Sequence, residues 1–203
     1  MHNSESREFL NNNQWVSSAV VTVSNRDKAK RFQVKVKPVG HQLISEIGVQ
    51  AFSKRILTEI PSVDRWNCHL ELVHIHDQAL EMTKAGESNS QPGVLSWIQE
   101  QAQHRLLLDV VPELVFFQGH FPDNPILPGV TQLHWAAQYA TNLFGFNDIP
   151  YEIKRLKFKS IIQPPTVVEL LLERKQENEV QFQLSSSGQI HSTGCLVFEE
   201  GIS

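Results

Sequence analysis

A histidine and a run of prolines stand directly before the longest helical pattern of the chain. His120 follows Gly119, and Pro122, Pro125 and Pro128 come after it at three-residue spacing. Proline fixes the backbone φ angle and removes a hydrogen-bond donor, so this loop is stiff. A stiff loop around a histidine indicates an imidazole that has to be held in place.

A helix that begins just after this loop would supply a second chemical group. We expect its start at Gly129 and Val130, because Pro128 precedes them. The first N–H groups of a helix have no partner inside it, so they can hold an oxygen that becomes negative during a reaction. Glycine at 129 lets a carbonyl approach the backbone closely. A neutral imidazole at position 120, with an ordinary pKa of about 6.5, can remove a proton. Together they suit proton abstraction next to a thioester carbonyl, and the alternative is a structural loop histidine.

The same residues resemble the signature of a known family. Gly119-His-Phe-Pro122, then Pro125, then Pro128-Gly-Val130 resembles the motif of the bacterial FabZ and FabA dehydratases. The strand pattern from Ile153 to Phe158 and the last two strand patterns of the chain are similar to the same family, over about 100 residues in all. The stretch from Pro125 to Ala136 looks most similar to the branch that acts in aryl polyene and related polyene lipid assembly.

This resemblance implies a hotdog fold, in which an antiparallel sheet wraps a long helix and two units pair as a homodimer or heterodimer. It implies dehydration of a 3-hydroxyacyl chain on acyl carrier protein to a trans-2-enoyl thioester, with no metal and no cofactor. In this scheme His120 takes the proton, and the amides of Gly129 and Val130 hold the thioester oxygen. Three further residues would contact the substrate: Phe121, Pro128 and Leu133. Neighbouring apolar residues such as Phe116 and Trp135 either line an acyl tunnel or, as we expect for most of them, belong to the core or a dimer interface.

Position 134 departs from the family, which has Glu or Asp there, whereas this chain has His134. Val130 and His134 lie four residues apart, so both are expected on one helix face. Three interpretations remain open: an imidazolium that gives the departing hydroxyl its proton, a ring that orients a water which does so, or an inactive site in a non-catalytic hotdog that binds carrier protein or an active partner. A thioesterase is a weaker option, because that chemistry usually needs a carboxylate that this site lacks.

The elements that would position these residues lie in a predicted hotdog domain, residues 99–203. A helix is predicted at 129–144, ending at Gly145, with one apolar stripe made by Val130, Leu133, Ala137, Ala140, Leu143 and Phe144. Residues 94–106 are predicted as a short helix or a connecting arm. Alternation and β-branched residues predict strands at 106–111, 151–158, 167–172, 180–185 and 189–198.

Residues 1–98 predict a small α+β domain, with strands at 15–23, 31–37 and 70–75 and one helix over 43–60. This part resembles the C-terminal subdomain of acyl-adenylating enzymes, chiefly from Trp15 to Val21 and from Val34 to Leu57. The lysine of that subdomain has no match, because Asn89 to Gly93 stands at its place. The resemblance therefore implies a relic or docking module without adenylation activity, and a second, degenerate hotdog is the alternative.

Composition narrows the classes of partner. Of the 203 residues 40% are hydrophobic and 20% charged, as in globular proteins, and the net charge of −4 leaves no broad basic surface for nucleic acid. No apolar run approaches the roughly 20 residues of a membrane span. The first residues lack the apolar core of a signal peptide, and two cysteines in different halves form no disulfide framework, so we expect a cytoplasmic protein.

One basic cluster stands out against this acidic background. After residue 100 there are seven basic and eleven acidic side chains, and four of the seven are Lys154, Arg155, Lys157 and Lys159. The cluster is either a solvated strand face or a contact for an acidic carrier protein. His74 and His76 have metal-like spacing, but with no third ligand we expect a half-exposed strand face and no metal site.

Overall fold

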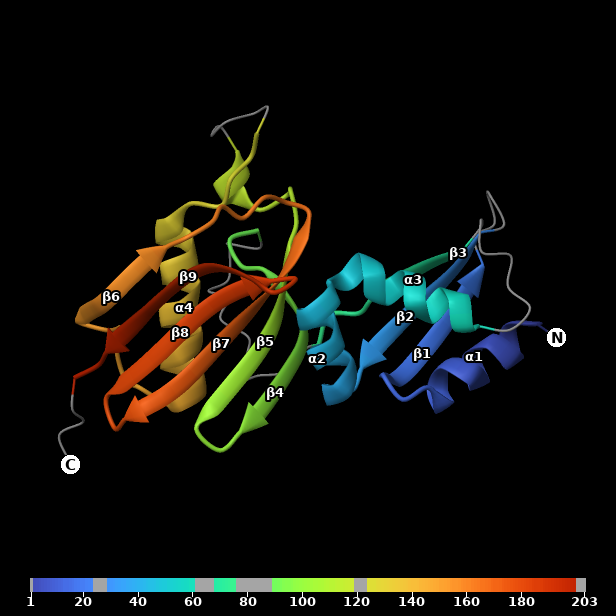
Figure 1. The fold of residues 1–203 in the computed structure, drawn as a ribbon, viewed down its shortest axis with the longest axis horizontal. Helices are drawn as coiled ribbons and strands as arrows, with labels where there is room; N and C mark the ends of the chain where they lie inside the picture. Colours follow the sequence, from blue (N-terminus) through green and yellow to red (C-terminus); the bar gives the residue numbers. More distant parts are fainter. Residues whose placement is uncertain (1, 24–28, 61–67, 76–88, 119–123, 200–203) are drawn as a thin grey trace. The chain divides into compact units, whose positions relative to one another are not determined.

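The computed structural model describes residues 2–23, 29–60, 68–75, 89–118 and 124–199 (Figure 1). The chain forms two compact units, residues 1–75 and 76–203. In the part of the chain that is described, no helix has the length and hydrophobicity needed to cross a bilayer.

The N-terminal unit is the small α+β domain that the sequence predicts. Its elements are α1 (His2–Asn12), β1 (Val16–Val23), β2 (Lys30–Val36), α2 (Pro38–Ile47), α3 (Val49–Glu59) and β3 (Cys68–Leu72). In the sheet β2 lies in the centre, antiparallel to β1 and parallel to β3. Alternation along β2 buries Phe32 and Val34, and Trp15 meets the ring of Phe52 edge-on at 6.5 Å.

The single helix expected over 43–60 is wrong, because α2 and α3 are separate helices. Gly48 between them has φ 81°, a conformation that favours glycine, and its N–H bonds Ile44 O at 2.8 Å. The chain therefore turns at the one residue that can do so at little cost.

A six-stranded antiparallel sheet forms the C-terminal unit. Its strands are β4 (Gly93–Glu100), β5 (Gln103–Val110), β6 (Glu152–Phe158), β7 (Thr166–Gln176), β8 (Glu179–Ser186) and β9 (Gln189–Val197), in the order β4-β5-β7-β8-β9-β6. Beside it a short 3₁₀ helix spans Val115–Phe117, and α4 spans Gly129–Phe144. Figure 1 shows α4 lying along one face of the sheet. The predicted long helix with its antiparallel sheet is therefore confirmed.

The structure corrects the expectation for residues 94–106. They are not a helix or an arm but most of the β4–β5 hairpin, in which Trp97 pairs with Leu106 and Glu100 with Gln103. The sheet therefore begins at Gly93, and the expected boundary between 98 and 99 falls inside β4.

α4 has the predicted bounds but not the predicted buried face. Its buried residues are Thr131, Gln132, Trp135, Ala136, Tyr139 and Ala140. Val130, which belongs to the predicted apolar stripe, is 72% exposed. The face of α4 that the sheet covers is thus shifted around the helix by about one residue position from the apolar stripe. The sheet covers this face because it carries the two largest side chains, Trp135 and Tyr139.

Aromatic side chains close the C-terminal end of α4. Gly145 adopts φ 71° as the helix ends. The guanidinium of Arg174 from β7 donates to Phe144 O at 2.8 Å and lies 4.8 Å and 4.9 Å from the ring centroids of Phe144 and Phe146. Phe146 in turn stacks on Phe198 at 3.7 Å. A cation at the carbonyl end of a helix is favourable, so Arg174 caps α4 as well as packing on it.

Candidate active site at the start of the long helix

The predicted catalytic and substrate-binding residues that the structure describes lie at the N-cap and on the first two turns of α4. Pro128 is the N-cap residue, Gly129 and Val130 follow, and Leu133 and His134 lie one turn further on. His120 and Phe121 lie outside the described residues.

The backbone at the beginning of α4 offers two N–H groups. Pro128 O accepts from Thr131 N at 3.1 Å and from Gln132 N at 3.2 Å, and Pro128 has no side-chain cap to give. Within the described part of the chain, no acceptor is found for the N–H of Gly129 or Val130. Unpaired amides at a helix start carry partial positive charge, so this point can hold an anionic oxygen.

Phe158 of β6 closes over Gly129. A Cβ atom built at position 129 would lie 2.7 Å from Cε1 and from Cζ of the Phe158 ring. Any larger residue at position 129 would therefore have to displace this aromatic ring. Sequence reasoning missed this role of Phe158, although Lys157-Phe158-Lys159 carries the signal, since one apolar residue between two cations on a strand points to the opposite face.

The loop before α4 is pinned by the segment that follows β6. Leu127 N donates to Ile162 O at 2.8 Å, and both residues are only 1% exposed. The Gln163 side-chain amide donates to Asn124 Oδ1. The Gln132 amide donates to Leu127 O at 3.3 Å, and its own oxygen is buried without a partner in the described residues. The start of α4 is thus held from two sides.

Val130 and His134 both face outward from α4, as their spacing predicts. Val130 is 72% exposed and His134 is exposed, whereas Leu133 is half-buried. Trp135 is fully buried and lines no tunnel among the described residues: its Nε1 donates to Ser90 O at 3.3 Å, and its ring lies 6.1 Å from that of Phe116. It belongs to the core, so the open side of the helix is the one that carries His134.

A β-bulge gathers the basic cluster on one face of the sheet. Lys154 pairs with Cys195 and Lys157 with Thr193, so β6 has one residue more than β9 between these pairs. Within the bulge Arg155 has φ 54°, which is unusual for a residue with a side chain. Strict alternation would place Lys154 and Lys157 on opposite faces, whereas the bulge turns both to the same side.

The cations of this cluster are not equivalent. Lys154 donates to Glu179 at 2.9 Å and lies 3.7 Å from Glu152, and the hydrogen bond to Glu179 raises the pKa of Lys154. In the described residues Arg155, Lys157 and Lys159 have no ion pair within 4.0 Å. These three unpaired cations are the ones free to meet another molecule.

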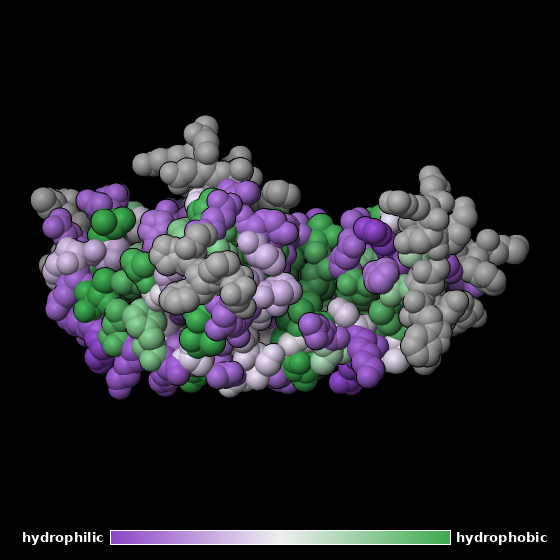
Figure 2. Space-filling model, turned by 90° about the horizontal axis from the view of Figure 1, so that it is seen from above, coloured by the Kyte–Doolittle hydropathy of each residue, from purple (hydrophilic) through white to green (hydrophobic). Residues whose placement is uncertain are grey.

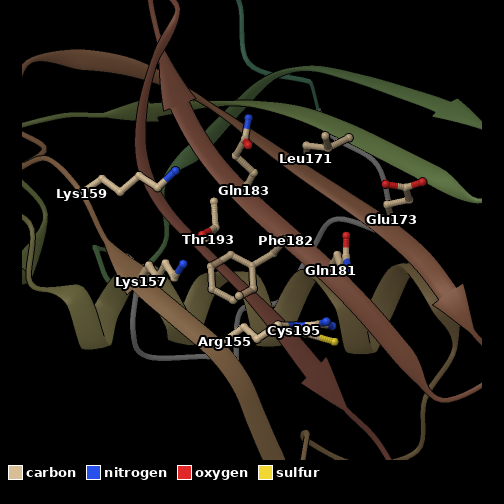
Figure 3. Close-up of a pocket in the computed structure, with 11 residues that line it drawn as sticks. Arg155, Lys157, Lys159, Leu171, Glu173, Gln181, Phe182, Gln183, Thr193 and Cys195 are labelled. Atoms are coloured by element: carbon tan, nitrogen blue, oxygen red, sulfur yellow. The ribbon is translucent and has the colours of Figure 1, made fainter.

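Arg155, Lys157 and Lys159 line a groove of about 420 Å³ together with side chains of β7, β8 and β9 (Figure 3). Cross-strand pairs place Leu171, Gln183, Thr193 and Lys157 in one row of the face away from α4. The single carboxylate, Glu173, meets Lys175 at 2.5 Å, and this contact lowers the pKa of Glu173. The groove is therefore positively charged, although the chain as a whole is acidic.

Comparison with known proteins supports the resemblance. The family model described as ApeI-like, ApeI dehydratase, matches residues 96–195. A 3-hydroxyacyl-[acyl-carrier-protein] dehydratase FabZ of Clostridium novyi is 33% identical over 102 residues, which cover 37% of this chain and 72% of that protein. The FabZ of Levilactobacillus brevis is 38% identical over 65 residues, 29% of this chain. The chain spans 44% of that protein and less than half of several other FabZ proteins.

Among solved structures, the dehydratase heterocomplex ApeI:P of Xenorhabdus doucetiae is similar at a TM-score of 0.51 and 27% identity, over 54% of this chain and 99% of the matched chain. The hotdog fold expected for the C-terminal unit is thereby confirmed. With its long helix, its sheet order and the Pro-Gly-Val start of α4, the chain belongs to the FabZ and ApeI-like family of hotdog dehydratases.

Proposed function

We propose that the C-terminal unit dehydrates 3-hydroxyacyl thioesters of acyl carrier protein to trans-2-enoyl thioesters, in fatty acid or polyene lipid assembly. The observation that carries the proposal is the pair of amides at Gly129 and Val130, which have no acceptor among the described residues, at the start of the helix that exposes His134. The names of the FabZ relatives support this substrate class, and the resemblance of the stretch from Pro125 to Ala136 supports the polyene branch.

The reaction needs a base, a proton donor and a place for negative charge. The neutral imidazole of His120 takes the proton from the carbon next to the thioester carbonyl. The electron pair left behind forms the new carbon–carbon double bond as the hydroxyl leaves from the next carbon. The amides of Gly129 and Val130 hold the charge that develops on the thioester oxygen, where a fixed dipole costs no rearrangement. Pro128, Phe121 and Leu133 would shape the walls around the acyl chain.

His134 would complete the reaction from the position where relatives have an acid. As an imidazolium it gives its proton to the departing hydroxyl, so that water leaves. The base at position 120 then returns its proton to His134 through solvent, and both rings regain their starting forms. The exposed position of His134, on the same side of α4 as Val130, supports this assignment.

A second hotdog unit would cover this side of α4. In the described residues the backbone of β6 pairs with β9 alone, so the other edge of β6 is open. Figure 2 shows hydrophobic residues on the surface of the C-terminal unit, at the left of the picture. The exposed large apolar residues of β6 and its surroundings are Val130, Tyr151, Ile153, Leu156, Phe158 and Ile161. An open strand edge beside an apolar patch is typical of an association surface, here for a second copy or a related hotdog.

The basic groove would receive the acidic surface of the carrier protein. Arg155, Lys157 and Lys159 line it and form no ion pair within 4.0 Å in the described part of the chain, whereas Lys154 is paired with Glu179 and Glu152. We expect Lys157→Glu to slow carrier association, with a salt dependence that follows the lost charge. Lys35→Glu on β2 makes the same change in net charge and is the control, so equal slowing by both variants would contradict the assignment.

One assay tests the function. The purified chain is given 3-hydroxyacyl carrier protein, and the loss of one water is followed by mass spectrometry. Enoyl product that disappears in His120→Ala supports the dehydratase. Release of free acid would instead indicate a thioesterase.

A non-catalytic hotdog subunit is the second candidate, favoured by the histidine at position 134 and by the match to a heterocomplex. It predicts a wild-type chain without dehydratase activity that still binds carrier protein or an active dehydratase. Wild-type activity of the purified chain alone would exclude it.

A further inference from the structure

His191 is a buried histidine of β9 that the proposed reaction does not use. It is 5% exposed and has a hydroxyl group on each side. Its Nδ1 lies 2.9 Å from Ser160 Oγ, and its Nε2 lies 2.7 Å from Ser186 Oγ. Because both ring nitrogens have partners, the orientation of the imidazole is fixed.

The hydrogen-bond partners of the ring determine the tautomer of His191. Ser160 Oγ donates its single hydrogen to Ile190 O at 2.8 Å, so it can only accept from Nδ1. Nδ1 therefore carries the imidazole hydrogen, and Nε2 accepts from Ser186. Burial lowers the pKa of His191, against the opposite effect of backbone hydrogen bonds at Ser160 and Ile161, and this favours the neutral ring.

The backbone of His191 holds the same segment as its ring. His191 O accepts from Lys159 N at 2.7 Å and from Ser160 N at 3.3 Å. Two residues further on, Ile162 O accepts from Leu127 N at 2.8 Å. Leu127 immediately precedes Pro128, the N-cap of α4. A continuous series of hydrogen bonds and two short backbone segments thus joins His191 to the first amides of the helix.

The Leu127 bond matters because its loop has few donors. Between Pro125 and Pro128, which have no N–H, only Ile126 and Leu127 can donate from the backbone. Leu127 and Ile162 are both 1% exposed, so water does not compete for their bond. The position of the segment after β6 therefore decides where this loop enters α4.

We propose that His191 is a positioning residue for the site: it holds Ser160, so that Ile162 can fix Leu127 and set the direction of the amides of Gly129 and Val130. The role of His191 in positioning this loop rests on the contacts alone. Only the expected effect of His191 on turnover rests on the proposed function.

Hydrogen exchange of the Leu127 amide in the full chain tests the structural part. We expect His191→Leu and Ser160→Ala each to speed this exchange about fivefold, as the loss of one hydrogen bond would. His191→Asn keeps a donor near the position of Nδ1 and should restore most of the protection. Ser186→Ala removes only the partner of Nε2 and is the matched control. The amide of Arg174, bonded to Ala102 O at 2.8 Å, reports on global opening.

Faster exchange at Leu127 with unchanged exchange at Arg174 supports the proposal. Unchanged exchange at Leu127 in both His191→Leu and Ser160→Ala overturns it, as does equal acceleration at Leu127 and Arg174, which would mean a general loss of stability. Where the wild type is active, we expect kcat of His191→Leu and Ser160→Ala to fall at least about tenfold, with KM within about twofold. Misplaced amides weaken the binding of the transition state and leave that of the substrate nearly unchanged. A chain without dehydratase activity would refute the proposed function and leave the exchange result to decide the role of His191.

Discussion

Replacing Gly129 by alanine measures how closely β6 closes over the start of α4. The new Cβ would lie 2.7 Å from two atoms of the Phe158 ring and 3.1 Å from a third. Carbon atoms in contact lie about 3.5–4.0 Å apart, so the ring has to move by roughly 1 Å. Phe158 is 52% exposed in the single chain, so its ring can turn toward solvent. The higher helix propensity of alanine, worth at most about 1 kcal/mol, partly offsets the cost. We therefore expect the free energy of unfolding to change by less than about 1 kcal/mol, while kcat/KM falls at least about tenfold because the displaced ring and the new methyl group disturb the amide site.

In a Phe158→Ala background the methyl group added by Gly129→Ala has room. Urea unfolding of Gly129→Ala, Phe158→Ala and the double variant gives a double-mutant cycle, and we expect a coupling energy of about 1 kcal/mol. The double variant should also recover activity relative to Gly129→Ala alone. If the two changes add to within about 0.5 kcal/mol and activity does not recover, Phe158 does not close over Gly129, and the reasoning about this site is refuted.

Three further predictions follow from other contacts. His134→Ala should lower kcat at least about 100-fold, whereas His134→Glu, which restores the family's acid, should stay active; an Ala variant as active as wild type would rule out proton donation. Burial lowers the pKa of His104 and His191, with the charge of Arg174 adding to the effect at His104. The neutral rings therefore contribute fully to the free energy of unfolding above pH about 6.5. This contribution is lost as the pH falls toward the pKa values of the folded state, by at most about 1.4 kcal/mol per pH unit for each ring. Equal free energies of urea unfolding at pH 5 and pH 7 would contradict this. Arg174→Met removes the bond to Phe144 O and the contacts with two rings, so the free energy of unfolding should fall by about 1–3 kcal/mol, and an unchanged thermal midpoint would argue against capping.

Helix α4 was predictable because its signals are local. Pro128 before Gly129 and Gly145 after Phe144 mark the two ends of α4, and the structure places the helix between them. Strand β8 alternates apolar and polar residues, and Gly188 marks the turn from β8 to β9, so the pattern of this hairpin also needs no distant partner to be recognised. Such elements are specified by neighbours in the sequence.

The misassigned elements depend on residues far along the chain. The run from Gly93 to Ile98 has no clear period, and only its pairing with β5 makes it a strand. The bulge at Arg155 is set by the register against β9, so the sequence alone cannot show that Lys154 and Lys157 share a face. The contact of Phe158 with Gly129 has the same origin, because it needs the sheet and the helix to be in place.

The face of α4 that the sheet leaves open links these differences to function. The helix has more apolar surface than one sheet can cover, and the sheet takes the side of Trp135 and Tyr139, which bury the largest area. Val130 therefore remains exposed, one residue after Gly129, which Phe158 of the open strand β6 contacts. Apolar surface in water is unfavourable by about 25 cal/mol per Å², so a second unit that covers this patch would be stabilised by doing so. His134 lies on the same side of the helix as Val130, and the partner would then also exclude water from the proposed acyl site. The chemistry that the sequence indicates in one chain is therefore expected to be complete only in a pair.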